Sequence, residues 1–228
     1  MSSVAYCISG EMRALDVWHT HTSNVVSPYS ADVFLHTWKR GIAGSSDDPF
    51  KERGGWSPYV YSNFEALATI NPTGFLIEDK SNLVVDYCAE VKRQSEWSDI
   101  VPRERCFYMW RGWYYSHMVS TFRKPYDVII RTRTDILYDS EIKVDVDALE
   151  DRTVYIPEGN DSAGYCDWFA MGKADTMSIY CSLYLKVGDY MREGVALHPE
   201  YMLAHHLKTN NISVKRFPHR FILHRTFV

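Results

Sequence analysis

Short apolar runs rich in β-branched residues alternate with helical periodicity along the first part of the chain. Val4–Ser9 and Ala31–Thr37 have the composition of buried strands, and apolar side chains between Leu15 and Val25 recur at helical spacing. A strand, a helix and a strand in this order form a βαβ unit, which implies two parallel strands and a right-handed crossover. A third strand is predicted at Phe75–Glu78.

The remaining chain continues the alternation of helices and strands. Further strands are predicted at Asp127–Ile130, Glu141–Val146, Thr153–Pro157, Cys166–Gly172, Ile212–Phe217 and Phe221–Leu223. Helices are predicted at 81–96, at 106–122, at 174–191 and from His198 onward. The helix at 106–122 is expected to bury one face, made of Phe107, Trp110, Tyr114, Met118 and Thr121. The helix at 174–191 is expected to point Met177, Cys181, Tyr184 and Leu185 inward. We expect one α/β domain over 1–228. Its mostly parallel central sheet has helices on both faces, and Glu141–Val146 and Thr153–Pro157 form a small second sheet segment.

Three charged residues follow a predicted strand that is rich in β-branched residues. Asp127–Ile130 runs directly into Arg131, Arg133 and Asp135. Burying a charge without a partner is costly, and ligands of open α/β sheets bind beyond the carboxyl ends of the strands. We therefore expect Asp135 to hold a divalent metal and the two arginines to face a diphosphate. The structural alternative is an Arg–Asp ion pair that closes the strand.

The turn after the first strand is where such folds receive a nucleotide, and we expect it to join the arginines at one common edge of the sheet. Backbone N–H groups at the start of a helix favour anions, and Ser9-Gly10 permits a close approach. Arg13 can bind a phosphate with two hydrogen bonds, unless it is a solvated arginine at the helix start. The sequence has no GxGxxG fingerprint for a dinucleotide. Asp79, which follows the third strand, can receive a ribose hydroxyl or a base N–H, unless it belongs to a solvated turn.

Asp167 interrupts the apolar run Cys166–Gly172, and isolated acids in such runs are candidates for function. A structural or acceptor-binding carboxylate is the alternative. His198-Pro199-Glu200 opens a helix, with Pro199 well placed in its first turn. The polar loop 38–58 is rich in Gly, Ser and Asp, and a loop of this length is more often a lid than a plain connection.

Composition narrows the function classes. The net charge of −4 gives no basic field, which argues against general nucleic-acid binding. The 16 Tyr, 10 Phe and 7 Trp suit a sugar site but suit a core equally well. The five cysteines form no CxxC motif and four lie in apolar segments, which indicates reduced, buried thiols. We expect a cytoplasmic protein with no signal peptide and no membrane span.

Five segments carry a resemblance to a known family. They are Ile8–Arg13, Ala31–Trp38, Arg131–Asp135, Asp167–Gly172 and His198–Glu200. In this order they resemble small glycosyltransferases of the Rossmann-like GT-A fold, including those of bacterial and large-DNA-virus polysaccharide gene sets. The resemblance implies transfer of a sugar from a UDP- or GDP-linked donor to a hydroxyl of an oligosaccharide or glycoprotein acceptor. It also implies a nucleotide-sugar-binding half over 1–135 and an acceptor-binding half over 136–228.

The family's metal motif is incomplete here. GT-A enzymes usually carry a DxD triplet whose carboxylates bind Mn²⁺ or Mg²⁺ on the donor's diphosphate. The matching triplet is Arg133-Thr134-Asp135, so only the last carboxylate is present. One carboxylate binds such ions weakly, although the diphosphate supplies further oxygens. His224 or His219 can complete the site, as a late histidine does in some of these families, unless both are structural or exposed.

The implied chemistry assigns roles to these residues. A metal on Asp135 and the guanidinium groups of Arg13, Arg131 or Arg133 help the nucleoside diphosphate to leave. In an inverting reaction, Asp167 is the first choice for the base and Glu200 the second. A retaining enzyme can use the same residues differently. Two other functions stay open: a non-catalytic carbohydrate-binding domain on the same fold, and a sugar nucleotidyltransferase, which needs a richer glycine loop than Ser9-Gly10.

Overall fold

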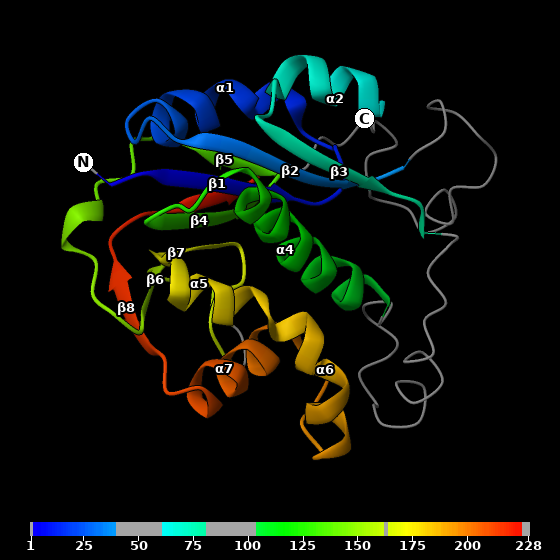
Figure 1. Cartoon of the computed structure of the whole chain (residues 1–228), viewed down its shortest axis with the longest axis vertical. Coiled ribbons are helices and arrows are strands. Elements are labelled where there is room, and N and C mark those ends of the chain that lie inside the picture. The colour runs from blue at the N-terminus through cyan, green and yellow to red at the C-terminus, as the bar shows by residue number, and fades with distance from the viewer. Residues whose placement is uncertain (1, 40–60, 81–103, 162–163, 225–228) are drawn as a thin grey trace.

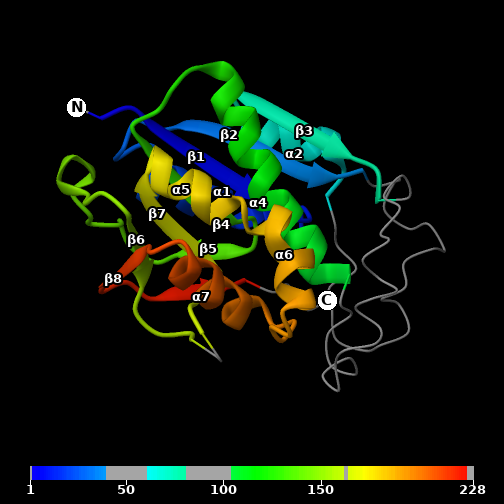
Figure 2. The same ribbon diagram turned by 60° about the horizontal axis from the view of Figure 1, so that its bottom comes forward.

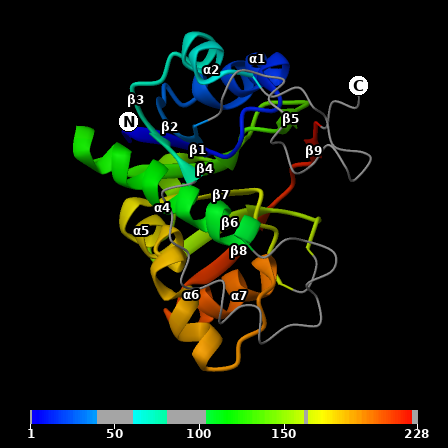
Figure 3. The same cartoon turned by 90° about the vertical axis from the view of Figure 1, so that its right-hand side faces the viewer.

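A computed structural model describes residues 2–39, 61–80, 104–161 and 164–224 of the chain. The helix predicted at 81–96 and all but the start of the loop 38–58 lie outside these residues. In the described part, seven strands form one sheet in the order β3-β2-β1-β4-β7-β6-β8, and β5 pairs with β9 in a second, small sheet. Figure 3 shows β5 beside β9.

The elements have the following bounds. The strands are β1 (Val4–Ser9), β2 (Asp32–Trp38), β3 (Gly74–Glu78), β4 (Val128–Arg133), β5 (Ile136–Tyr138), β6 (Thr153–Pro157), β7 (Phe169–Lys173), β8 (Ser213–Phe217) and β9 (Phe221–Leu223). The helices are α1 (Trp18–His21), α2 (Asn63–Ile70), α4 (Glu104–Arg123), α5 (Ala174–Cys181), α6 (Leu183–Arg192) and α7 (Pro199–Thr209). A 3₁₀ turn (Leu15–Val17) precedes α1 and a π-helical turn (Thr22–Val26) follows it, while a second 3₁₀ turn spans Val146–Ala148.

The central sheet is mostly parallel, which confirms the α/β fold class. Strands β3, β2, β1 and β4 are parallel neighbours, and β6 is parallel to β8. Strand β7 runs antiparallel to both of its neighbours, β4 and β6. All residues of β1 are buried, because parallel strands covered by helices on both faces have no solvent-exposed side.

Two hydrophobic cores lie on opposite faces of this sheet. Side chains alternate along β1, so that Val4, Tyr6 and Ile8 pack with α1, whereas Ala5 and Cys7 pack with α4. Figure 1 shows α1 and α2 above the sheet and α4 to α7 below it, and Figure 2 shows α4 to α7 from the side that they cover.

Helix α2 has local signals for both of its ends. At its start, Ser62 and Glu65 form a capping box, in which the Ser62 hydroxyl accepts from the Glu65 N–H and the Glu65 carboxylate accepts from the Ser62 N–H. At its end, Asn71 takes up the left-handed conformation, with φ +47°. The chain can then turn directly into β3.

The predicted strand at Glu141–Val146 is wrong, and Thr153–Pro157 belongs to the central sheet as β6. The physical reason is a tyrosine from the α1 side. The Tyr29 hydroxyl donates to the Ile142 carbonyl at 2.7 Å and accepts from the Val144 N–H at 3.2 Å. Backbone groups that a neighbouring strand would otherwise bind are therefore already satisfied.

Two helix predictions also need correction. The helix predicted at 174–191 consists of α5 and α6, separated at Ser182, and the Leu185 side chain is 55% exposed instead of inward. In α4, Thr121 is exposed and Trp113 is fully buried, so the buried face is not the predicted aromatic stripe. Helices α4 and α5 pack against other helices as well as the sheet, and α6 packs against α4, α5 and α7, which moves and widens the buried faces.

The predicted state of the cysteines is confirmed where the structure describes them. Cys7, Cys106, Cys166 and Cys181 are free and buried, and burial raises the pKa of each thiol. Such thiols are chemically inert at neutral pH. Among the described helices, none has the length and apolar character needed to cross a membrane.

Candidate functional site

The carboxyl ends of β1 and β4 lie side by side, with Ser9 opposite Arg133 in the register. The chain leaves β1 through α1 on one face of the sheet and enters β4 from α4 on the other face. Two neighbouring strands whose connections lie on opposite faces define the topological switch point, where ligands of open α/β sheets bind. We therefore expect a ligand at these two strand ends.

Gly10 brings the two strand ends into contact. Its φ of +138° would strain any other residue, and a Cβ at this position would lie 3.2 Å from the Thr134 hydroxyl oxygen. That hydroxyl donates to the Glu11 carbonyl at 2.7 Å. The turn after β1 is therefore fixed against the turn after β4, and glycine is the residue that permits this.

Arg133 and Asp135 form a bidentate ion pair. The Arg133 Nε and Nη2 atoms each donate to a different Asp135 oxygen at 2.8 Å. Burial raises the pKa of Asp135, but the charge and hydrogen bonds of Arg133, together with the charge of Arg13, outweigh it and leave the pKa below its ordinary value. The side chain of Asp135 is 7% exposed and that of Arg133 is 25% exposed. Strand β4 is thus closed by an Arg–Asp ion pair, which is the structural alternative to a metal and diphosphate site.

Glu11 holds two cations at the same strand ends. Its carboxylate accepts from Arg13 Nε at 2.9 Å and from Nη2 of the same side chain, and it accepts from Lys80 Nζ at 2.7 Å. The Lys80 ammonium group also lies 5.0 Å from the centre of the Tyr108 ring. Sequence reasoning selected Arg13 but missed Glu11 and Lys80, because only the fold brings Lys80 to the first turn.

Arg131 lies beneath this surface, where it cannot face a bound diphosphate directly. It is 0% exposed, and its guanidinium carbon lies 4.0 Å from the centre of the Trp113 ring. Nη1 donates to the backbone carbonyl of Asp167, whereas Nε and Nη2 have no hydrogen-bond partner among the described residues. Burial lowers the pKa of Arg131. This side chain ties the end of β4 to the segment that precedes β7.

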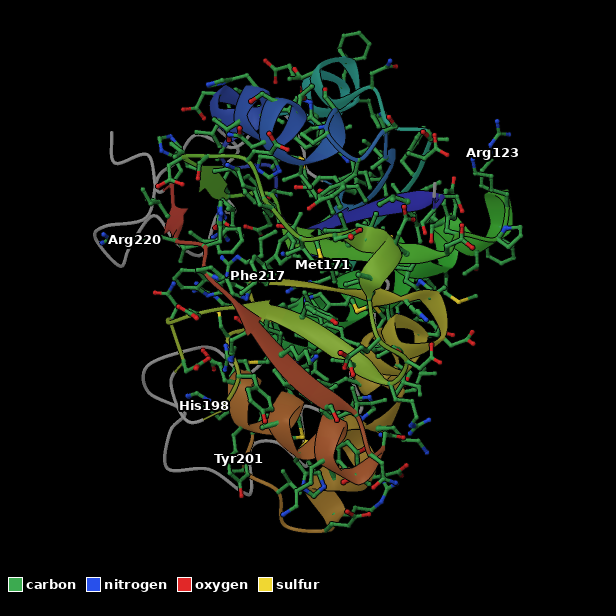
Figure 4. All side chains as sticks on the ribbon, turned by 90° about the vertical axis from the view of Figure 1, so that its left-hand side faces the viewer. Arg123, Met171, His198, Tyr201, Phe217 and Arg220 are labelled. Carbon is green, nitrogen blue, oxygen red and sulfur yellow. The ribbon has the colours of Figure 1, made fainter. Side chains whose placement is uncertain are left out.

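Asp167 and Glu200 form a pair of carboxyl groups in the second half of the chain. Asp167 is buried and precedes β7 instead of interrupting it. Glu200 lies in the first turn of α7, where burial and the charge of Asp167 raise the pKa of its carboxyl group. His198 Nδ1 lies 3.0 Å from Glu200 Oε2. Figure 4 shows His198 and Tyr201 together at the start of α7, on the outer side of the molecule.

Two predicted nucleotide-binding residues have local partners. The Ser9 side chain is buried against α4, since a Cβ at Gly112 would approach Ser9 Cβ to 3.0 Å. The Asp79 carboxylate lies 3.3 Å from Lys39 Nζ. Ser9 therefore contributes to packing at the end of β1, whereas Asp79 lies in a partly exposed ion pair after β3, on the far side of β2.

The two late histidines differ in their relation to Asp135. The backbone N–H of His224 donates to the Asp135 carbonyl at 2.8 Å, but its imidazole Nε2 lies 2.8 Å from an Asp16 oxygen. The His219 Nε2 atom lies 4.0 Å from Asp139, and burial lowers the pKa of this histidine. The fold thus brings the backbone of His224 to Asp135 while its ring binds another carboxylate.

The described residues do not fit a resident divalent cation. Both oxygens of Asp135 accept from Arg133, and among the described residues no group of three or more His, Cys, Asp or Glu side chains could hold a metal ion. A cationic guanidinium in contact with the carboxylate also opposes a second positive charge there. Metal assistance by Mn²⁺ or Mg²⁺ stays a prediction of the family resemblance.

A polar cluster that sequence reasoning missed lies at the ends of β2 and β3. Glu78 accepts from Arg111 Nε at 2.9 Å and from Arg111 Nη2 at 2.6 Å, and His36 Nε2 lies 2.8 Å from the same carboxylate. Burial opposes ionisation of Glu78, but His36 and Arg111 lower its pKa to about 2. The signal in the sequence was a histidine that follows the apolar residues Val33, Phe34 and Leu35 of strand β2, and only the register identifies its partner.

Comparison with known proteins assigns no family to the chain. No protein-family model matches it, and no curated protein matches it in sequence. The function therefore has to be inferred from the geometry of these strand ends.

Proposed function

We propose that the chain is a glycosyltransferase of the GT-A type, which moves a sugar from a UDP- or GDP-linked donor to a hydroxyl of a glycan acceptor. The placement of Arg13 and Arg133 at two neighbouring strand ends carries this proposal, because Ser9 at the end of β1 lies opposite Arg133 in the register and Arg13 follows in the turn after β1. Against burial, which raises the pKa of Asp135, the charges of both arginines lower it. One arginine comes from the turn after β1 and the other from the end of β4. Two guanidinium groups at a switch point match the charge and geometry of a diphosphate.

The donor half of the reaction needs stabilisation of a departing anion. As the bond between the sugar and the diphosphate breaks, negative charge grows on the diphosphate oxygens. Arg13, Arg133 and Lys80 lie around one strand end and can bind those oxygens.

The acceptor half needs a base that accepts the hydroxyl proton as the oxygen attacks the anomeric carbon. Glu200 suits this role better than Asp167, because burial and the charge of Asp167 raise its pKa toward the working pH. Asp167 then acts beside it, as the second carboxylate that favours the protonated form of Glu200. This order reverses the preference drawn from the sequence. An inverting reaction is proposed, in which the hydroxyl attacks the face opposite the departing diphosphate.

A screen of UDP- and GDP-linked sugars tests the proposal. The wild-type protein is incubated with each donor, with Mn²⁺ or with EDTA, and the release of UDP or GDP is measured with and without an oligosaccharide acceptor. At least one donor is expected to release its nucleotide. Glu200→Gln should then slow transfer about 100-fold or more, since general bases contribute that much. The matched control is Glu193→Gln, whose partly exposed carboxylate lies 3.9 Å from His205 and should leave the rate unchanged.

One observation favours a second candidate, a carbohydrate-binding domain without catalysis. The Arg133–Asp135 pair already satisfies both groups, as a purely structural strand end would. Glycan binding that is unaffected by UDP, GDP and metal, with no release of nucleotide from any donor, would identify this second function and exclude the first.

A further inference from the structure

A chain of hydrogen bonds crosses the core on the α1 face of the sheet. The Thr132 hydroxyl lies 2.7 Å from the Tyr138 hydroxyl, which lies 3.2 Å from the Tyr6 hydroxyl. Tyr6 lies 2.7 Å from His21 Nδ1, and His21 Nε2 lies 2.7 Å from the Ile136 carbonyl oxygen. We call these residues the neutral relay. All four side chains are buried.

The chemistry of each group fixes the direction of every bond. A carbonyl oxygen only accepts, so the proton of His21 is on Nε2 and Nδ1 of the neutral ring is an acceptor. Tyr6 must therefore donate its one hydroxyl proton to His21, and it accepts from Tyr138. Tyr138 has then used its own proton and accepts from Thr132. The relay runs in one direction, from the Thr132 hydroxyl to the Ile136 carbonyl.

The two ends of the neutral relay enclose the triplet at the end of β4. Thr132 directly precedes Arg133, and Ile136 directly follows Asp135. Two further bonds hold the middle of the relay, because the Tyr138 N–H donates to Thr20 Oγ1 at 3.2 Å and Asn24 donates to the Tyr138 carbonyl at 2.9 Å. A change in the relay therefore alters the backbone on both sides of the ion pair.

We infer that Tyr6, His21 and Tyr138 are positioning residues, which hold the backbone of residues 132–136 so that Arg133 faces the diphosphate with its guanidinium fixed by Asp135. This inference rests on the proposed function. None of the three side chains contacts the ligand; they act through the backbone on either side of the ion pair. Partners behind a binding residue commonly change affinity about tenfold or more when they are removed.

The chain offers a matched control on the other face of the sheet. The Tyr190 hydroxyl lies 2.8 Å from His206 Nδ1, and His206 Nε2 lies 2.7 Å from the Ile179 carbonyl. This bridge has the same chemistry as the one between Tyr6, His21 and Ile136, and it is buried to a similar degree. It joins α5, α6 and α7 without touching residues 132–136. Removing a hydroxyl here should destabilise the fold without altering the ion pair.

The experiment compares Tyr6→Phe with Tyr190→Phe. Thermal unfolding measures the stability of each, titration with UDP and with GDP measures affinity, and the Arg133 Hε signal in NMR spectra measures the ion pair. We expect similar losses of Tm in the two variants. Tyr6→Phe should weaken binding of the nucleotide about tenfold and speed exchange of Arg133 Hε. Tyr190→Phe should change neither by more than about twofold.

Rescue at the start of the relay keeps the test independent of folding. Thr132→Ser retains the hydroxyl and should behave as the wild type, whereas Thr132→Val removes it at nearly constant volume and should speed exchange of Arg133 Hε. The inference is wrong if Tyr6→Phe and Thr132→Val have the same nucleotide affinity and the same rate of Arg133 Hε exchange as Tyr190→Phe. If the wild type binds neither UDP nor GDP, the proposed function fails, and Hε exchange alone still decides whether the relay positions the ion pair.

Discussion

Two polar systems meet at the end of β4, and they satisfy their hydrogen bonds in opposite ways. On the α1 face, the neutral relay gives each donor one acceptor and carries no charge. At the ends of β1 and β4, Arg13 and Lys80 pair with Glu11, and Arg133 pairs with Asp135. On the α4 face, Arg131 stacks on Trp113 and donates to the Asp167 carbonyl. Arg131 keeps two nitrogens without a partner among the described residues.

We propose that this difference distinguishes the side of the strand end that faces a ligand. A complete network of neutral groups needs nothing further and makes the backbone rigid. An excess of cationic donors is costly to bury unless an anion can approach it. On this proposal, the neutral relay supports the strand end from behind, and the charged strand end offers the binding surface.

Removing the partner of the buried carboxylate should give the largest effect. Arg133→Met leaves Asp135 buried and charged without its partner, and such changes cost about 3–5 kcal/mol of unfolding free energy. Urea unfolding measures the loss. The control is the double variant Arg133→Met with Asp135→Leu, which removes both charges and should recover most of the stability. A single variant as stable as the wild type would mean that Asp135 is not held by this pair.

The neutral relay should make the unfolding free energy depend on pH over a defined acidic range. Burial lowers the pKa of His21 from 6.5 to about 4. Between these values the unfolded chain binds a proton that the folded protein excludes, so the unfolding free energy should fall as the pH falls from about 6.5 to about 4. A shift of this size corresponds to about 3 kcal/mol. Between pH 7 and pH 4, the unfolding free energy should therefore fall less in His21→Gln than in the wild type.

His117 on α4 is the comparison for the opposite face. Burial lowers its pKa to about 4 as well, although it forms no part of the neutral relay. His117→Gln should therefore remove a similar part of the loss of unfolding free energy at acidic pH. Exchange of Arg133 Hε should change in His21→Gln and stay constant in His117→Gln. Glu78, whose pKa is about 2, adds its own loss only between about pH 4.5 and pH 2, so it does not overlap with most of this window.

The smallest effect is expected where a charge competes with the ligand. Glu11 pairs with both Arg13 and Lys80 and offsets part of their positive charge. Glu11→Gln removes one negative charge from the site, so UDP or GDP should bind about three- to tenfold more tightly. Glu150→Gln, which affects the exposed pair with Lys215 on another part of the surface, is the control. Equal or weaker binding by Glu11→Gln would show that Arg13 and Lys80 do not face the diphosphate.

Several parts of the fold were readable from local patterns. The apolar runs identified β1, β2 and β3 within one or two residues, and Pro199 correctly marked the start of α7. Cys166–Gly172 was recognised as a strand, but its first three residues precede β7, which places Asp167 outside the sheet. Glu141–Val146 had the composition of a strand, yet Tyr29 binds its backbone from elsewhere in the chain.

The sequence by itself determined most of the strands and helices, although not β5 or the break between α5 and α6. It also marked Arg133, Asp135 and Gly10 as unusual, because charge at a strand end and glycine in a tight turn are local signals. Only the tertiary structure decided the partners. Arg131 and Arg133 are two residues apart on one strand, but one stacks on Trp113 and the other pairs with Asp135. Likewise, Tyr6, His21 and Tyr138 read as ordinary core residues until the fold joined them, since hydrogen bonds between distant segments depend on register and packing.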